Sequence, residues 1–187
     1  MNKRAFVFID GGNFYFKLKE LTSKLDRKFS LIDFNFRKFA EWLVRSNELV
    51  EIRYYLGAIK RERNNPKSEQ LYADQQKLLG KLQQQGIVIT LGQVIRHPDK
   101  THHEKGVDVR LAVEMIRFAR ENKYDIAYLV SSDTDLVAAV EEVKAFGKTV
   151  QYVGTPKGQS FGLSSVADDV RLLRPEEIEQ FLPNSLI

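Results

Sequence analysis

Four aspartates of this chain lie where carboxylates could bind a cation together. Asp133 and Asp135 are one residue apart in Ser131-Ser132-Asp133-Thr134-Asp135, between a short apolar run and a helical pattern. Two carboxylates this close repel each other, and a cation or a proton relieves that repulsion. Asp133 could equally cap the following helix, with Asp135 complementing the helix dipole. The motif alone leaves both readings open.

Asp10 and Asp108 occupy comparable positions elsewhere in the chain. Asp10 ends the apolar run at 5–9 and is followed by Gly11-Gly12-Asn13, whereas Asp108 opens a strongly periodic helical segment. If the chain reverses its direction of winding between the first and fourth strands, these acids line one crevice at the carboxyl edge of the sheet. Carboxylate clusters that keep several waters suit Mg²⁺ or Mn²⁺. The placement therefore predicts a metal site.

The elements that would position these acids alternate along the chain. Apolar runs predict strands at 4–9, 49–59, 87–91, 124–130 and 149–153, with a short edge strand at 168–173. Helical periodicity falls at 14–25, 33–44, 66–86, 106–119, 136–147 and 175–182, and the segments 92–105 and 154–165 are expected to be loops. The pattern predicts an α/β fold of three layers, α/β/α, with a central, mainly parallel, Rossmann-like sheet. We expect residues 1–187 to form a single domain.

Composition excludes some kinds of site and favours one kind of partner. The 187 residues include no cysteine, so disulfides and thiolate metal sites are excluded. That composition fits a cytoplasmic protein. The first apolar run is too short for a signal peptide and no window predicts a membrane span. The net charge of +4 is mild evidence for a polyanionic partner.

Cationic residues are concentrated in the segments expected at the same edge of the sheet as the acids. Basic side chains in this position would bind the phosphates that flank a scissile one. Taken singly, each is more simply a solvated surface residue. The candidates for nucleic-acid contact are Lys60, Arg61, Arg63, Arg96, His102, His103 and Lys105.

Histidines and aromatic residues near these segments have competing readings. His97, His102 and His103 lack the regular spacing of a zinc site, so we expect surface or RNA-contacting residues. The aromatic residues could stack on bases, but we expect most to be core, with Tyr15, close to Asp10, as the exception. The aromatic residues concerned are Phe14, Tyr15, Phe16, Tyr54 and Tyr55.

The ordered set of motifs resembles a known family. Phe8-Ile9-Asp10-Gly11-Gly12-Asn13, then Lys105-Gly106-Val107-Asp108, then Ser131-Ser132-Asp133-Thr134-Asp135-Leu136 resembles NYN domains, in particular the LabA-like branch of the PIN-like nuclease superfamily. The likeness spans roughly residues 4–173. One departure is Ser132, where members of this type often carry glycine.

The resemblance implies a metal-dependent ribonuclease fold and a set of roles. Asp10, Asp108, Asp133 and Asp135 match the family's acidic cluster, and Asn13 matches its amide. Ser131 or Ser132 matches its small hydroxyl residue, and both are candidates for nucleic-acid contact. The expected activity is hydrolysis of single-stranded RNA with Mg²⁺ or Mn²⁺, with Asp10 and Asp133 as direct ligands. PIN-like proteins often pair, so a homodimer is a further expectation.

Two other functions compete with this one. A haloacid-dehalogenase-like phosphatase needs a second aspartate two residues after the first, and that position is Gly12. A non-catalytic RNA-binding or regulatory scaffold would keep the fold without turnover. The sequence does not choose between internal and end-directed cutting, between RNA and DNA, or between one and two metal ions.

Overall fold

The computed structural model describes residues 2–23, 25, 30–59, 61, 64–96 and 102–183. Within these ranges, the side chains of 93–96 and 102–105 are not described. No helix in the described ranges is long and apolar enough to cross a bilayer.

Six parallel strands form the central sheet, in the order β3-β2-β1-β6-β7-β8. Their bounds are β1 Arg4–Asp10, β2 Glu48–Leu56, β3 Val88–Leu91, β6 Ile126–Val130, β7 Thr149–Gly154 and β8 Asp169–Leu172. After β3 the chain crosses to the other side of β1 and continues outward from β6. The direction of winding therefore reverses between β1 and β6, as expected, and this is where α/β sheets bind ligands.

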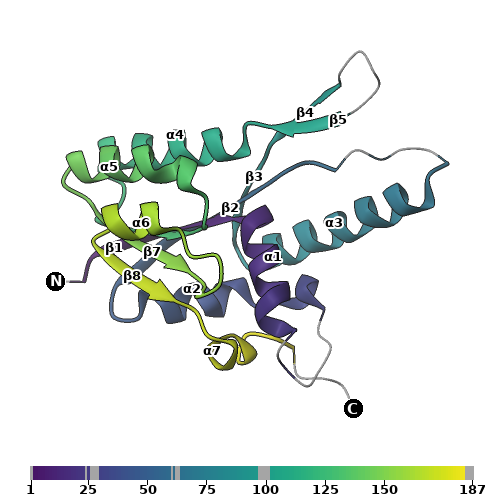
Figure 1. Ribbon diagram of the computed structural model, residues 1–187, viewed down its shortest axis with the longest axis horizontal. Helices are drawn as coiled ribbons and strands as arrows, with labels where there is room; N and C mark the ends of the chain where they lie inside the picture. The colour runs from purple at the N-terminus through teal and green to yellow at the C-terminus, as the bar shows by residue number, and fades with distance from the viewer. Residues whose placement is uncertain are drawn as a thin grey trace.

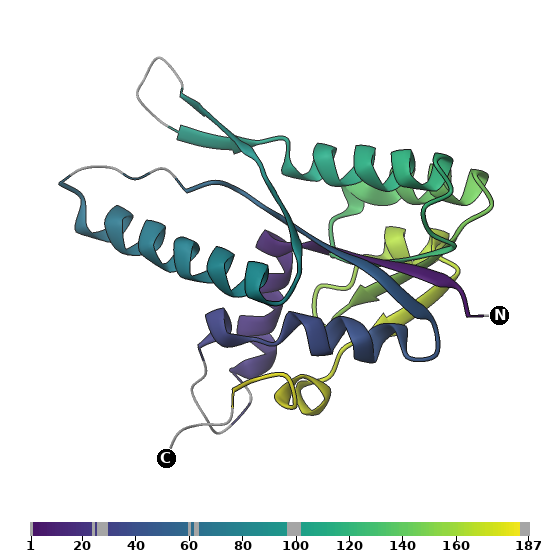
Figure 2. The same cartoon turned by 180° about the vertical axis from the view of Figure 1, so that it is seen from behind.

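Helices cover both faces of the sheet, which gives the predicted three-layer α/β/α architecture (Figures 1 and 2). Ala5, Val7 and Ile9 of β1 pack into one core cluster, and Phe6 and Phe8 pack into the other. This alternation follows from the two-residue period of a strand. The first core is covered by α1 Gly11–Thr22, α2 Phe36–Val44, α3 Pro66–Gln84 and α7 Pro175–Glu179. The second is covered by α4 Val107–Arg120, α5 Val137–Ala145 and α6 Phe161–Val166.

Two segments that we predicted to be loops contain regular structure. The segment 92–105 contains an antiparallel hairpin, β4 Gln93–Arg96 with β5 His102–Lys105, which projects from the body of the molecule (Figure 1). The segment 154–165 contains most of α6, whose N-cap Ser160 accepts a hydrogen bond from the Leu163 N–H. The described residues also form two short 3₁₀ turns, η1 Leu31–Asp33 and η2 Thr134–Leu136.

Some predicted boundaries also shift. The first helix begins at Gly11, because the Asp10 side chain caps its N-terminus, and it ends at Thr22. β2 ends at Leu56, and the main chain at 57–59 leaves the sheet instead of continuing the strand. The edge strand β8 and the short helix α7 lie where they were predicted.

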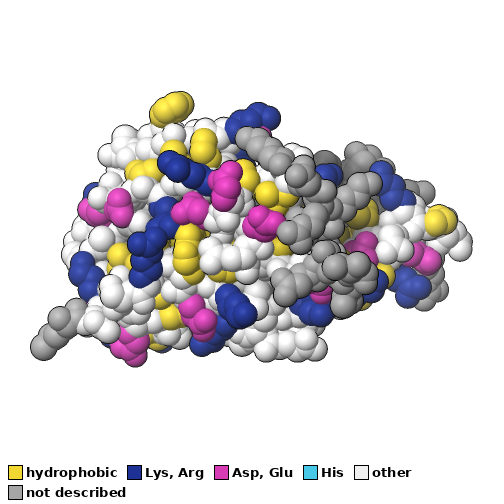
Figure 3. All heavy atoms as spheres, turned by 90° about the horizontal axis from the view of Figure 1, so that it is seen from below, with side chains coloured by type: hydrophobic (Ala, Val, Ile, Leu, Met, Phe, Trp, Pro, Cys, Tyr) yellow, Lys and Arg dark blue, Asp and Glu magenta, His cyan; other side chains and the backbone are white. Residues whose placement is uncertain are grey.

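Acidic and basic side chains are interspersed on the face shown in Figure 3. Apolar atoms lie between them as small separate areas wherever that face is described. The excess positive charge is therefore not gathered into one patch on the described part of this face.

Candidate functional site

Asp10 ends β1 at the switch point and is almost fully buried, with 6% of its surface exposed. Its Oδ1 accepts a hydrogen bond from the Asn13 N–H at 3.1 Å, and its Oδ2 accepts one from the Ser131 hydroxyl at 2.8 Å. The adjacent position 11 has room only for glycine. A Cβ there would collide with the Tyr54 ring and lie 2.7 Å from the Tyr55 carbonyl oxygen. Glycine thus lets α1 begin directly behind the carboxylate.

The loop after β6 is connected to Asp10 through Ser131. The Ser131 hydroxyl accepts a hydrogen bond from the Asp133 N–H at 3.1 Å while it donates to Asp10. The side-chain oxygen of Asn13 accepts a hydrogen bond from the Ser132 N–H at 3.1 Å. These contacts fix the ends of β1 and β6 relative to each other.

The Ser131 side chain is already engaged within the protein. We predicted that Ser131 contacts nucleic acid, but only 2% of its surface is exposed and its hydroxyl already bonds Asp10 and Asp133. Its position lets it orient the two acids. Ser132 is partly exposed beside it.

Asp108 reaches the same edge from the first turn of α4. The helix begins after Gly106, whose φ of 84° is in the left-handed region that favours glycine. Asp10, Asp108 and Asp133 line one cavity of about 300 Å³, together with Gly12, Asn13, Phe16, Leu56, Gly57 and Val107. Three acids from three separate elements thus lie around one space, which we call the acidic cavity.

Asp133 and Asp135 also have the structural role that the sequence left open. The Asp133 Oδ1 caps η2 and accepts a hydrogen bond from the Asp135 N–H at 2.9 Å. Asp135 is exposed and does not line the acidic cavity. Capping uses one oxygen of Asp133, so both readings of this motif are compatible.

The pKa values of two cavity acids are raised. Burial raises the pKa of Asp10 and the charge of Asp133 adds to this, while hydrogen bonds from Asn13, Ser131 and Gly12 oppose it. Desolvation raises the pKa of Asp108, as do the charges of Asp10, Asp133 and Asp135. Among the described residues, the charges that shift these two pKa values all belong to other aspartates. A bound cation would relieve that repulsion.

The fit to a metal ion depends on water as well as protein. In the described part of the chain, no group of three or more histidine, aspartate or glutamate side chains is gathered closely enough to hold an ion alone. Mg²⁺ commonly takes one or two carboxylates and keeps several waters. The acidic cavity offers hard oxygen donors and room for water, so its residues fit an ion of this kind.

The predicted cationic residues are only partly placed. Lys60, Arg63 and His97 lie outside the described residues, and of Arg96, His102, His103 and Lys105 only the backbone is described, on the β4–β5 hairpin. Arg61 lies 3.5 Å from Glu69, an exposed pair. The structure thus places the backbone of β5 immediately before Gly106 and Asp108.

A buried carboxylate that sequence reasoning missed lies beneath the site. Glu114 of α4 accepts hydrogen bonds from Arg53 at 2.8 Å, from the Tyr55 hydroxyl at 2.9 Å and from Arg110 at 2.7 Å. Tyr55 is the β2 partner of Asp10 in the strand register. This network ties α4, which carries Asp108, to the strand beside Asp10. The sequence does indicate that Glu114 is buried, because the 3.6-residue period of α4 places it between Leu111 and Met115 on the apolar face of the helix.

The aromatic residues divide as follows. Phe14, Tyr54 and Tyr55 are buried, as predicted, and Tyr15 is the expected exception, with 45% exposed. Phe16 was expected in the core and is 70% exposed. It lies on the opposite side of α1 from the buried stripe and lines the acidic cavity.

A comparison with protein families decides the relationship. The model of the NYN domain matches residues 4–173. The chain belongs to the NYN domain family. NYN domains are part of the PIN-like nuclease superfamily, and membership points to nuclease activity.

Comparisons with individual proteins add support for the fold alone. No curated protein matches the chain. A crystal structure of a protein of unknown function from Vibrio parahaemolyticus is similar, with 22% identity, a TM-score of 0.66 and 97% of each chain covered. MurG of Acinetobacter baumannii has 13% identity and a TM-score of 0.45 over 90% of this chain and 40% of its own. An isopentenyl phosphate kinase has 12% identity and a TM-score of 0.38 over 95% of this NYN chain and 93% of its own. At TM-scores below 0.5 the last two likenesses carry no functional argument.

Proposed function

We propose that this NYN protein is a metal-dependent ribonuclease of the LabA-like branch that hydrolyses phosphodiester bonds in single-stranded RNA. The observation that carries the proposal is the acidic cavity. Asp10, Asp108 and Asp133 come from three elements, and the described charges that shift the pKa values of Asp10 and Asp108 are all negative. An uncompensated acidic cluster at a switch point suits a cation that in turn binds a phosphate.

The protein residues would act as follows. Asp10 and Asp133 would hold Mg²⁺ or Mn²⁺, with Asp108 and Asp135 binding through water or orienting the attacking water. The ion, when bound, would stabilise phosphate charge and lower the pKa of water. Ser131 and the Asn13 N–H hold the Asp10 carboxylate in place.

The remaining groups would bind the substrate around this centre. The side-chain oxygen of Asn13 is used by the Ser132 N–H, so its NH₂ group is the part left to donate to a phosphate or a carboxylate. Lys105 would offset negative charge that develops in the transition state, and the other cations would bind flanking phosphates. The attacking water would lose a proton to solvent and bond to phosphorus in line with the leaving oxygen, the P–O bond to that oxygen would break, and the leaving oxygen would take a proton from solvent.

The first test is cleavage of labelled single-stranded RNA with Mn²⁺, with EDTA, and with Asp133→Asn. We expect cleavage in Mn²⁺, and a loss of about 10³-fold or more with either EDTA or the substitution. The matched control is Asp125→Asn, at the opposite end of β6, where the carboxylate pairs with Arg4 at 2.9 Å. This variant should cut RNA like the unchanged protein.

Two results would contradict the proposal. Cleavage by Asp133→Asn at the rate of Asp125→Asn would mean that the acidic cavity is not the site. RNA that stays intact with the unchanged protein in Mn²⁺, but is bound whether or not metal is present, would favour the scaffold function.

A further inference from the structure

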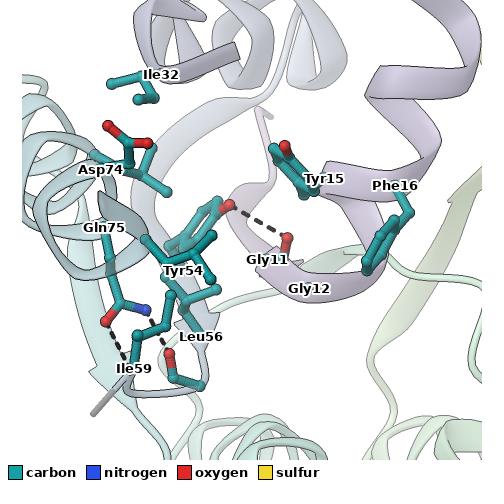
Figure 4. Close-up of a pocket in the computed structure, with 13 residues that line it drawn as sticks. Gly11, Gly12, Tyr15, Phe16, Ile32, Tyr54, Leu56, Ile59, Asp74 and Gln75 are labelled. Carbon is teal, nitrogen blue, oxygen red and sulfur yellow. Dashed lines mark hydrogen bonds between the residues drawn. The ribbon is translucent and has the colours of Figure 1, made fainter. Parts of the chain in front are cut away.

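A second cavity, of about 350 Å³, lies between α1 and α3 (Figure 4). Tyr15 and Phe16 of α1 are on one side of it, Gln75 of α3 is on the other, and Tyr54 and Leu56 of β2 lie between them. We call it the α1–α3 cavity. Its volume is in the range of pockets that bind small organic groups.

The α1–α3 cavity adjoins the acidic cavity. The two share four lining residues, which are Gly12, Phe16, Leu56 and Gly57. A ligand with one group at the acids can therefore extend past Phe16 and Gly57 without leaving the protein surface. A nucleotide whose phosphate occupies the acidic cavity has its base within this reach.

Exposed apolar side chains gather at this cavity. Tyr15, Phe16 and Leu71 are 45%, 70% and 47% exposed, and all three line it. Large apolar groups that cluster in contact with water usually mark a binding site. Aromatic rings in such a position can stack on the face of any base.

Charge distinguishes a base from a phosphate as the occupant. The described residues that line the α1–α3 cavity include no lysine, arginine or histidine, and Asp74 is the charged group among them. A phosphate in the cavity would meet the Asp74 carboxylate and no cation in the described lining, since Lys77, 3.7 Å from Asp74, lies outside that lining. A neutral, planar base meets neither obstacle.

The wall of the cavity is also preformed. The Gln75 side chain is buried and donates to the Gly57 carbonyl oxygen at 2.6 Å, and it accepts from the Ile59 N–H at 2.8 Å. These two bonds hold the main chain that follows β2 against α3 (Figure 4). This wall of the cavity is therefore held in place without a ligand.

We propose that the α1–α3 cavity binds the base of the nucleotide next to the scissile phosphate, stacked on Tyr15. This inference rests on the proposed function, since it takes the scissile phosphate to lie in the acidic cavity. It assigns Tyr15 and Leu71 to substrate binding and makes the cavity the place where one unpaired base is held. A duplex, whose bases are stacked inside, would not fill it.

The test compares RNA strands that each lack one base, with cleavage measured as separate kcat and KM. For the unchanged protein, removal of the base next to the cut should raise KM about tenfold, while removal of distant bases should not. Tyr15→Ala should raise KM on intact RNA by a similar factor. In this variant, removal of the base next to the cut should cause no further rise in KM. Leu71→Ala, which lines only the α1–α3 cavity, should behave in the same way with a smaller factor.

The matched control is Phe146→Ala. Phe146 is an aromatic residue with 40% exposed, at the C-terminal end of α5 and outside both cavities. This variant should retain the KM and the base sensitivity of the unchanged protein. Equal base sensitivity in Tyr15→Ala and Phe146→Ala, with RNA still cut, would overturn the inference and leave the proposed function standing.

If no RNA is cut, a binding measurement distinguishes failure of the proposed ribonuclease function from failure of the proposed base site. Single-stranded RNA that carries 2-aminopurine is titrated with protein in EDTA, and the fluorescence of the base reports stacking. Quenching by the unchanged protein that is lost in Tyr15→Ala would support base binding at this cavity without catalysis. No quenching, or the same quenching in Tyr15→Ala, would overturn the inference.

Discussion

Asp10 and Glu114 are two buried carboxylates in neighbouring regions of the molecule, and they are stabilised in opposite ways. Glu114, with 2% exposed, receives hydrogen bonds from Arg53, Arg110 and Tyr55. Burial alone would raise the pKa of Glu114, but these contacts outweigh it and lower that pKa. Asp10, with 6% exposed, receives hydrogen bonds only from uncharged groups among those described, and its pKa is raised.

The difference separates a carboxylate that holds the fold together from one that is kept ready for a ligand. A buried charge is costly unless an opposite charge accompanies it. Glu114 has its cations within the protein, so it connects α4 to β2 permanently. Asp10 lacks one among the described residues and is therefore suited to a cation from solution. Exchanging each acid for its amide should give opposite outcomes.

The largest expected effect is on catalysis. Asp10→Asn should reduce metal-dependent RNA cleavage about 10³-fold or more, because the amide is a poor ligand for a hard cation. Its free energy of unfolding without metal should stay equal or rise, because a buried, uncompensated charge is removed. Cleavage kinetics and urea unfolding of the same preparation measure both. A large loss of stability would mean that Asp10 serves the fold in the way that Glu114 does.

The second effect is on stability. Glu114→Gln should lower the free energy of unfolding by about 1–3 kcal/mol, since it removes the buried carboxylate that Arg53 shares with Arg110 and leaves Arg53 paired with the partly exposed Glu51. Cleavage by the folded fraction should persist within about tenfold. Glu41→Gln is the control, because Glu41 pairs with Arg37 on the exposed side of α2, and it should change stability by less than about 1 kcal/mol. Equal losses in the two variants would remove the distinction between this network and an ordinary surface pair.

The smallest effect is a difference in pH dependence without metal. The pKa of Asp10 in the folded state is above its ordinary value of 3.8. At pH values between these two pKa values the folded state binds more protons than the unfolded state, so the stability of the protein falls as the pH rises. For Glu114 the folded pKa is below its ordinary value of 4.5, so its contribution is complete above that value and is lost as pH falls through the lowered pKa. The free energy of unfolding is measured between pH 3 and 7. Compared with the unchanged protein, Asp10→Asn should lose less stability as the pH rises towards neutral. Glu114→Gln should lose less stability as the pH falls into the acid range. Identical profiles for the two variants would contradict these assignments.

The sheet and the gathering of the acids were predictable because both follow from local patterns. Apolar runs of strand length alternate with helical segments; Asp10 comes directly after one run, and Asp133 follows another after two serines. Parallel strands bring such ends to one edge whatever the details of packing. The strand order meets the condition on which this prediction depends, because the winding switches between β1 and β6.

The rest depended on partners far away in the chain. Periodicity places Glu114 on the apolar face of α4, but its role is not evident until Arg53, 61 positions earlier, is placed beside it. The β4–β5 hairpin was missed because His102-His103-Glu104-Lys105 has no apolar alternation, and its backbone pairing supplies the order. The α6 helix was missed because Pro156, Gly158 and Gly162 read as loop residues. Phe16 was misplaced because hydrophobicity alone does not reveal which side of α1 meets the core.

The hydrogen bonds between the ends of β1 and β6 also bear on how the protein is made. Ser131 bonds Asp10 across 121 positions, and Ser132 bonds Asn13 across 119. Contacts of such long range form only after the intervening chain has been synthesised and β6 has paired with β1. During translation, the nascent chain therefore cannot assemble the acidic cavity until Asp133 has left the ribosome. The RNA that encodes the protein is read well past the codon for Asp133 before the site can exist.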